Sequence, residues 1–199
     1  MATPSPAEVD TRQRLIDVAV DLFTRHSFAG TSLQMIADEL GFTKAAIYHH
    51  FRTREQLLDA VVAPILEQLT VVIDDAEQLR GLHARADHML TGYAQLAVDN
   101  RVVAVLAADP AVAEMLRTRR EWDELIARQM KLLADVEPGA AGMVKAAVVL
   151  AGMAGASGPT FVNLDRDALR EHLVDAGRRA LGLRVARRRD MSRNSVDQQ

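Results

Sequence analysis

The chain has 199 residues and a formal charge of −3, from 24 lysines and arginines against 27 aspartates and glutamates. It contains no cysteine, which excludes a disulfide scaffold and a thiolate metal site. Hydrophobic residues make up 49% of the chain, but aromatic residues make up only 4%. Because strands favour β-branched and aromatic residues, this composition, rich in alanine, leucine and arginine, predicts an all-α protein.

The two ends of the chain are expected to lie outside the folded core. Residues 1–9 are interpreted as a flexible leader, because they contain two prolines and lack the apolar core of a secretory signal. We therefore expect a cytoplasmic protein. Residues 184–199 form a basic tail that we predict to be disordered, and a solvated terminus is favoured over contact with nucleic-acid phosphates. Residues 146–162 are apolar but rich in glycine, which favours a buried helix over a membrane span.

Helical periodicity of the apolar residues runs through most of the chain, and prolines and glycines separate the periodic segments. Four helices are expected in the first third of the chain, and five more are expected in the rest. The predicted ranges are 9–26, 31–41, 43–50, 54–69, 82–100, 101–108, 110–134, 139–156 and 165–181.

Local signals set the ends of the early helices. Thr31 and Gln34, three residues later, have the form of a capping box at the start of the second helix. Thr43 is expected to cap the third helix with its hydroxyl. Pro64 is expected to kink the fourth helix, because proline removes a backbone donor and clashes with the preceding turn.

Residues 33–52 have the marks of a helix-turn-helix. Ala37 is small, which lets a second helix cross closely over the first. Gly41 lies where the chain must reverse, and a left-handed backbone is easiest there without a side chain. Ile36, Leu40 and Ile47 are expected to form the small core between the helices.

The outward face of the third helix is short and polar. With Ile47 pointing inward, a rotation of about 100° per residue directs Ala45 and His49 outward and places Lys44 and Tyr48 on the flank. Such a helix fits the major groove of DNA. Lys44 can reach a phosphate or a guanine, Tyr48 a phosphate oxygen, and His49 a phosphate or a base edge.

Two segments carry a family resemblance, GTSLQMIA at residues 30–37 and LGFTKAAIYHHFRTRE at residues 40–55. They resemble the DNA-binding domain of tetracycline-repressor-like (TetR family) regulators. The resemblance implies an N-terminal three-helix DNA-binding domain at residues 10–56. It also implies a larger helical ligand-binding and dimerisation domain at residues 57–183, whose sequence carries no family motif.

The resemblance further implies which residues contact DNA. Tyr48 and Arg54 are expected at phosphates. Arg54 stands where the family usually has lysine, but arginine keeps the charge and can grip a phosphate with two donors. The other expected DNA contacts are Ser32, Gln34, Thr43, Lys44, Ala45 and His49.

The N-terminal segment is not basic throughout, and its region without acidic residues lies around the third helix. Residues 1–56 contain six basic residues against seven acidic ones, but residues 43–54 contain three basic residues and no acid. We therefore expect local contacts with a few phosphates and a moderate dependence of binding on salt.

One helix-turn-helix reads few base pairs, so we expect a homodimer on a palindromic operator. Apolar faces of the last two helices are predicted to form a four-helix interface, with Gly152 and Gly155 permitting close approach. The alternative that these faces belong to the subunit's own core stays open. The predicted interface residues are Met143, Ala147, Leu150, Ala151, Ala154, Leu169, Leu173, Ala176 and Ala180.

The middle helices carry methionine, aromatic and histidine side chains that could line an apolar pocket for a small-molecule effector. A stripe of such residues also serves as ordinary core, and that alternative stays open. The candidate ligand-binding residues are His88, Met89, Tyr93, Met115 and Trp122.

No cofactor, metal or catalytic site is expected. His83 and His88 miss the spacing that places two ligands on one helix face, and the chain carries no glycine-rich phosphate loop or nucleophile elbow. The sequence predicts a ligand-responsive transcriptional repressor that is not an enzyme and that a small molecule releases from double-stranded operator DNA. The alternative is a helical enzyme or small-molecule carrier that retains the DNA-binding head.

Overall fold

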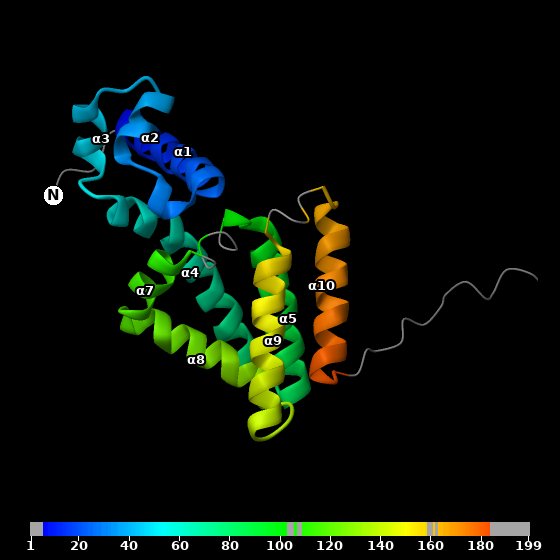
Figure 1. Ribbon diagram of the computed structural model, residues 1–199. Helices are drawn as coiled ribbons and strands as arrows, with labels where there is room; N and C mark the ends of the chain where they lie inside the picture. Colours follow the sequence, from blue (N-terminus) through cyan, green and yellow to red (C-terminus); the bar gives the residue numbers. More distant parts are fainter. Residues whose placement is uncertain (1–5, 103–105, 107–108, 159–160, 162, 184–199) are drawn as a thin grey trace, which may run out of the picture.

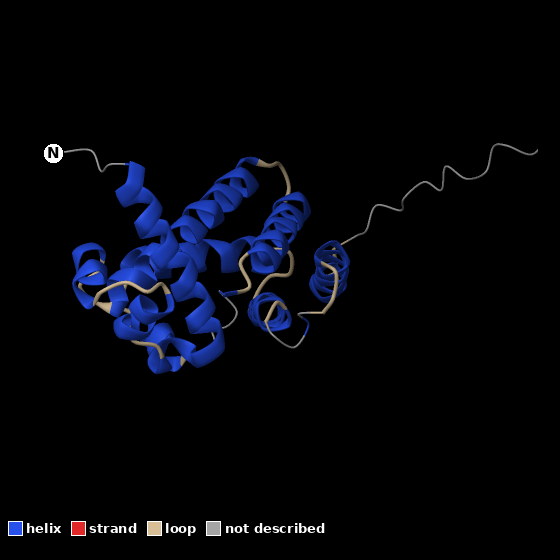
Figure 2. Cartoon of the chain, turned by 90° about the horizontal axis from the view of Figure 1, so that it is seen from above, coloured by secondary structure: helices blue, strands red, loops and turns tan. Residues whose placement is uncertain are grey.

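The computed structural model describes residues 6–102, 106, 109–158, 161 and 163–183, and within these ranges it is all-α, as predicted. Figures 1 and 2 show helices joined by short loops, with no strand in the described part. The described helices are α1 (Pro6–Gly30), α2 (Leu33–Glu39), α3 (Lys44–His50), α4 (Arg54–Gln78), α5 (Leu82–Asp99), α7 (Pro110–Arg117), α8 (Arg120–Ala134), α9 (Ala140–Ala156) and α10 (Arg166–Leu181).

The first helix is longer than predicted at both ends. α1 begins at Pro6, so the last four residues of the expected leader are helical, while residues 1–5 and the predicted tail at 184–199 lie outside the described residues. The expected break after residue 26 is a kink at Ser27, whose φ is 64° and ψ is 168°. Residues other than glycine rarely adopt this backbone conformation, so the chain changes direction at Ser27 before α2 begins.

The cap of α2 is Ser32, and the prediction of Thr31 was wrong. The Ser32 hydroxyl accepts a hydrogen bond from the Met35 amide at 3.1 Å. The Thr31 hydroxyl instead points into the protein, where it donates to the carbonyl oxygens of Leu22 and Ser27 at 3.2 and 2.8 Å. Thr31 therefore ties the end of α1 together, and its neighbour caps the next helix.

Two other helix predictions needed correction. α4 continues through Pro64 to Gln78, because the extra turns bury Ile73 and Ala76 in the C-terminal core. The single helix expected over 110–134 is divided into α7 and α8 at Thr118, whose hydroxyl donates to the Met115 carbonyl at 2.7 Å. The helix expected at 101–108 falls largely outside the described residues, and the remaining predicted ranges agree to within two residues.

The described side chains form two hydrophobic cores. The N-terminal core joins α1, α2, α3 and the start of α4 with α7, and it includes Val102 and Leu106. The C-terminal core joins the end of α4 with α5, α8, α9 and α10. In Figure 1, α1, α2 and α3 lie at the top of the molecule, and α4 leads from them into the C-terminal helices.

α4 contributes to both cores and crosses the predicted domain boundary at residue 56. Its first half buries Leu57, Leu58 and Val61 beneath α1, and its second half packs on α5 and α8. By length and composition α4 is the one described helix that could span a membrane, but it lies between other helices of this protein. A single helix of 25 residues, with Pro64 inside it, is thus shared by the two hydrophobic cores.

Candidate DNA-binding face and ligand cavity

The turn between α2 and α3 has the geometry that the sequence predicts. Gly41 has a φ of 66°, which is the left-handed region. The Phe42 amide then donates to the Ala37 carbonyl at 2.8 Å, which closes the turn. Ala37 is fully buried, so its small side chain permits the close crossing of the two helices.

α3 presents a polar face because its apolar side chains anchor it from behind. Ile47 and Phe51 are buried, and the Thr43 hydroxyl caps the helix by accepting from the Ala46 amide at 3.3 Å. The Tyr48 side chain is 42% exposed, and the Lys44 ammonium lies 5.7 Å from the centre of its ring. The predicted outward residues are all exposed: Lys44, Ala45, Tyr48 and His49.

Ser32 and Gln34 are also exposed, at the start of α2. The Ser32 hydroxyl serves as the cap of α2, and the Gln34 amide donates to a carboxylate oxygen of Asp38 at 2.6 Å. Both side chains therefore face solvent beside the turn of the helix-turn-helix.

Two arginines on α1 join this face and were missed in the sequence. The Arg12 guanidinium lies 4.9 Å from the centre of the Phe51 ring, and the Arg14 guanidinium lies 5.3 Å from that of Phe42. Phe42 and Phe51 flank α3 at its two ends, so both exposed arginines lie beside α3. Sequence periodicity shows that they are solvent-facing, but only the packing of α1 shows which neighbours they have.

Arg54 was expected at a phosphate, but the structure gives it a contact within the protein. Its Nη1 donates to the carbonyl oxygens of Phe28, Ala29 and Thr31 at 3.1, 3.2 and 2.9 Å. These carbonyls lie at the C-terminal end of α1, past the kink at Ser27, and that of Phe28 also accepts from the Thr31 amide at 3.3 Å. A cation at the start of α4 therefore stabilises the end of α1. A phosphate contact by Arg54 stays a prediction.

An apolar cavity of about 350 Å³ lies between α4, α5, α8 and α9. Of the five predicted ligand-binding residues, Tyr93 and Trp122 line it. Met89 is buried in the C-terminal core, Met115 packs against the N-terminal core, and His88 is exposed. Burial raises the pKa of the Tyr93 hydroxyl, because the phenolate loses its hydration in this apolar setting.

Gln129 is the unexpected residue of the cavity. It is 1% exposed, and its Nε2 has no hydrogen-bond partner among the described residues. An unpaired buried amide typically costs about 1–3 kcal/mol, so native proteins rarely retain one without a reason. Its position on α8, beside Leu125 and Met130, gives no sequence signal, because a polar residue at one helical position usually faces solvent.

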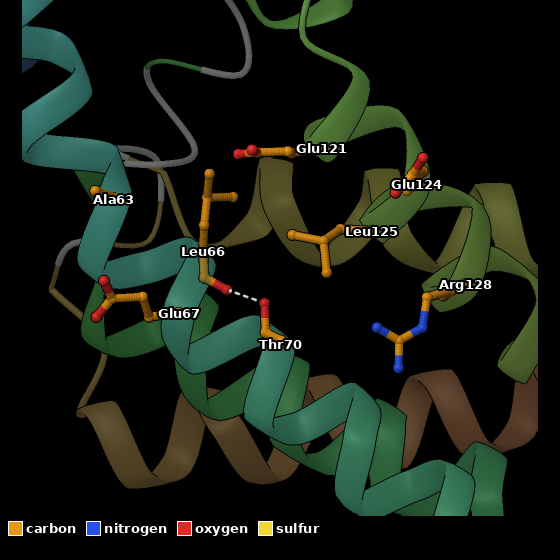
Figure 3. Close-up of a pocket in the computed structure, with 8 residues that line it drawn as sticks. All are labelled: Ala63, Leu66, Glu67, Thr70, Glu121, Glu124, Leu125 and Arg128. Atoms are coloured by element: carbon orange, nitrogen blue, oxygen red, sulfur yellow. Dashed lines mark hydrogen bonds between the residues drawn. The ribbon is translucent and has the colours of Figure 1, made fainter.

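A second hollow, of about 430 Å³, lies at the surface between α4 and α8 (Figure 3). Its carboxylates, from Glu67, Glu121 and Glu124, lie at separate places around the rim and do not converge. Arg128 is bound to Asp74 and Glu77 instead. No group of three histidines or acids able to hold a metal ion occurs in the described part of the chain.

The predicted dimer residues fall into two groups. Leu150, Leu169 and Leu173 are buried in the subunit's own C-terminal core, and Ala154 lines the cavity. The other predicted residues are exposed, although Ala147 and Ala151 also line the cavity. The exposed residues are Met143, Ala147, Ala151, Ala176 and Ala180.

Two large apolar side chains that the sequence analysis missed extend the exposed side of α9. Val144 and Val148 are both solvent-facing, next to Met143 and Ala147. They could have been found from their spacing of four residues, which places them on one helix face.

Comparison with known proteins gives a consistent result. Residues 15–61 match the family described as "Bacterial regulatory proteins, tetR family". The HTH-type transcriptional repressor KstR2 of Rhodococcus jostii is 34% identical over 73 residues, which are 34% of this chain and 35% of that protein. The HTH-type transcriptional regulator SrpR of Pseudomonas putida is 39% identical over 64 residues, 32% of this chain and 30% of that protein. The chain thus matches about a third of the length of these two relatives.

The fold extends the likeness beyond the N-terminal segment. The solved structure of the ketosteroid transcriptional regulator KstR2 of Mycobacterium tuberculosis superposes with a TM-score of 0.67. The superposition covers 86% of this chain and 93% of that one, at 17% identity. The helix-turn-helix of residues 33–50 thus lies in a segment that matches the tetR family of bacterial regulatory proteins, and the chain shares its all-α fold with a solved structure of a transcriptional regulator.

Proposed function

We propose that this protein is a ligand-responsive transcriptional regulator, a repressor, that binds a palindromic DNA operator as a homodimer. A small molecule in the cavity of the C-terminal helices releases it from the operator. The protein acts in the cytoplasm, where the DNA is, and its role requires no catalytic step.

The exposed face of α3 is the observation that most directly supports DNA binding. It offers a lysine, a tyrosine hydroxyl and a histidine, held in place by the buried Ile47 and Phe51. Arg12 and Arg14 add positive charge beside it, and neither forms an ion pair within the described residues. A short helix with this face enters a major groove while the surrounding cations contact phosphates.

The test begins with genomic fragments captured by the purified protein, which supply the operator sequence. Lys44→Ala and Tyr48→Phe are expected to weaken operator binding roughly tenfold, and Lys44→Ala to lower the salt slope by about one. Lys131→Ala is the matched control, because Lys131 is exposed on α8 and pairs with Asp135. Unchanged affinity in both α3 variants, measured by fluorescence anisotropy, would contradict the proposal.

The position of the cavity supports ligand response. Leu106 and Leu116 line the cavity and are also part of the N-terminal core. A ligand that moves these leucines therefore acts directly on the residues that support the helix-turn-helix. Release also requires that the ligand bind more tightly to the released state than to the DNA-bound state. Shifting the equilibrium between these states from 1:99 to 99:1 takes a difference in binding free energy of about 5.5 kcal/mol.

The outward side of α9 supports the homodimer. Met143, Val144 and Val148 are exposed there, and a Cβ atom added at Gly152 or Gly155 would have no neighbour within 4 Å among the described residues. An exposed apolar stripe that ends in small residues permits close approach by a second helix. α10 lies beside α9 (Figure 1) and adds exposed Ala176 and Ala180.

A small-molecule carrier that retains the head would need the same cavity but not the polar face of α3. Sequence-selective DNA binding that a cavity ligand weakens supports the regulator. A protein that binds small molecules in this cavity but selects no DNA sequence would support the carrier.

A further inference from the structure

The cavity has a specific chemical character that goes beyond the presence of a ligand site. Its walls are apolar apart from the polar atoms of four residues, Tyr93, Trp122, Gln129 and Ser157, and none of its lining residues is charged. Its volume of about 350 Å³ lies within the range of small-molecule sites. Any molecule that binds there moves from water into largely hydrocarbon surroundings.

Such walls exclude a charged ligand. A carboxylate or phosphate in this cavity would lose its hydration and would find no lysine, arginine or histidine in the lining. Tyr93 reports the same effect within the protein, because burial raises the pKa of its hydroxyl. The ligand must therefore be neutral and mostly apolar.

Two of these residues, Ser157 and Gln129, differ in what they can offer to a ligand. The Ser157 hydroxyl already donates to the Met153 carbonyl at 2.9 Å. Gln129 is buried, and its Nε2 has no partner in the described part of the chain. It is therefore a donor that the protein leaves unsatisfied at the wall of the cavity, and a ligand acceptor would satisfy it.

We propose that the effector is an uncharged, mainly hydrocarbon molecule with one carbonyl or similar oxygen, which accepts a hydrogen bond from Nε2 of Gln129. This inference rests on the proposed function only for the role of the cavity as the effector site. Its chemistry is tested on the protein alone, without DNA.

The experiment uses the full chain and the dye prodan, a neutral aromatic ketone whose emission shifts to the blue in apolar surroundings. Prodan is expected to bind with a blue shift. Methyl heptyl ketone, nonane and nonanoate then compete for the site, since they share a chain length but differ in the oxygen. Nonanoate should be the weakest competitor, because its charge loses its hydration in the cavity. The ketone also gives up its hydrogen bonds to water, so its hydrogen bond to the protein is measured by comparing the wild type with a variant that lacks the donor.

Gln129→Met removes the donor and keeps a side chain of similar length. It should weaken competition by the ketone roughly tenfold, the typical effect of one hydrogen bond, while leaving competition by nonane unchanged. Its melting temperature should stay the same or rise, because an unpaired buried amide has been removed. Gln68→Met is the matched control, since Gln68 is exposed on α4 and is not part of the cavity lining.

Three results would overturn the inference: no binding of prodan, nonanoate that competes as well as the ketone, or an unchanged affinity for the ketone in a folded Gln129→Met protein. A failure of operator binding would leave all three measurements intact. It would count against the proposed function alone, so the two failures are distinguishable.

Discussion

The carboxylate of Asp109 accepts a hydrogen bond from the backbone amide of Phe28, with 3.0 Å between Oδ2 and N. These residues are 81 positions apart. The other carboxylate oxygen caps α7 by accepting from the Ala111 amide at 2.9 Å. Asp109 thus joins the start of α7, a helix whose Leu116 lines the apolar cavity, to the kinked end of α1, which supports the helix-turn-helix.

Asp109→Asn is expected to lower the free energy of unfolding by about 1–3 kcal/mol, because an amide nitrogen would replace one of two buried acceptor oxygens. Urea unfolding measures the change. Asp165→Asn is the control: Asp165 caps α10 through the Ala168 amide, it is exposed, and asparagine caps about as well as aspartate. Equal losses in the two variants would show that the contact with Phe28 adds nothing.

Arg54→Lys distinguishes an internal contact from a phosphate contact. Lysine keeps the charge but lacks the planar guanidinium that reaches the carbonyls of Phe28, Ala29 and Thr31. We expect a lower free energy of unfolding, by about 1–2 kcal/mol, with an unchanged salt slope of operator binding. Arg52→Lys, at an exposed position, should leave stability unchanged. A stable Arg54→Lys protein with weakened DNA binding would assign Arg54 to phosphate instead.

Val148→Asp is expected to dissociate the proposed homodimer without unfolding the subunit, because Val148 is 63% exposed on the outer side of α9. Sedimentation measures the oligomeric state, and circular dichroism measures the fold. Val71→Asp is the matched control, with 58% exposure on α4, and should leave the dimer intact. A dimer that survives Val148→Asp would place the interface elsewhere.

Leu173→Asp, in contrast, is expected to unfold the subunit. Leu173 is buried in the C-terminal core, so the substitution places a carboxylate among apolar side chains with no partner. The loss of helical signal at room temperature is the expected result. A folded Leu173→Asp monomer would show instead that this side chain serves the interface.

The ion pairs of Arg128 join α8 to α4 and make stability depend on pH. Arg128 donates to both carboxylate oxygens of Glu77, at 3.0 and 2.7 Å, which lowers the pKa of Glu77 in the folded protein. The stabilisation is therefore present above the ordinary glutamate pKa of 4.5 and is lost as the pH falls through the lower folded pKa.

Glu77→Gln should accordingly lower the melting temperature at neutral pH. It should have little effect in acid, where the wild-type carboxylate is protonated and is therefore neutral, like the amide of glutamine. The effect should be small, because these side chains are partly exposed and water screens the pair. Glu67→Gln, on the exposed side of α4, is the control. A constant difference between wild type and Glu77→Gln at all pH values would contradict this assignment.

The sequence by itself determined the helix-turn-helix. Its signals are local: the left-handed Gly41, the small Ala37, the hydroxyl of Thr43 and the inward Ile47 all act within a few residues of one another. Local chemistry of this kind can be read along the chain, because helix periodicity and capping depend on near neighbours. The exposed face of α3 follows from the same periodicity.

Only the tertiary structure decided the roles that depend on distant neighbours. Arg54 donates to carbonyls at the end of α1, past the kink at Ser27, and no pattern near Arg54 predicts that kink. Leu173 and Val148 are equally apolar in sequence, but the packing of α9 and α10 buries one and exposes the other. In the sequence Gln129 resembles any exposed polar residue of a helix, but in the structure α4, α5 and α9 pack around it. Periodicity shows that a helix has an apolar face, but which partner covers that face is determined by how the helices pack together.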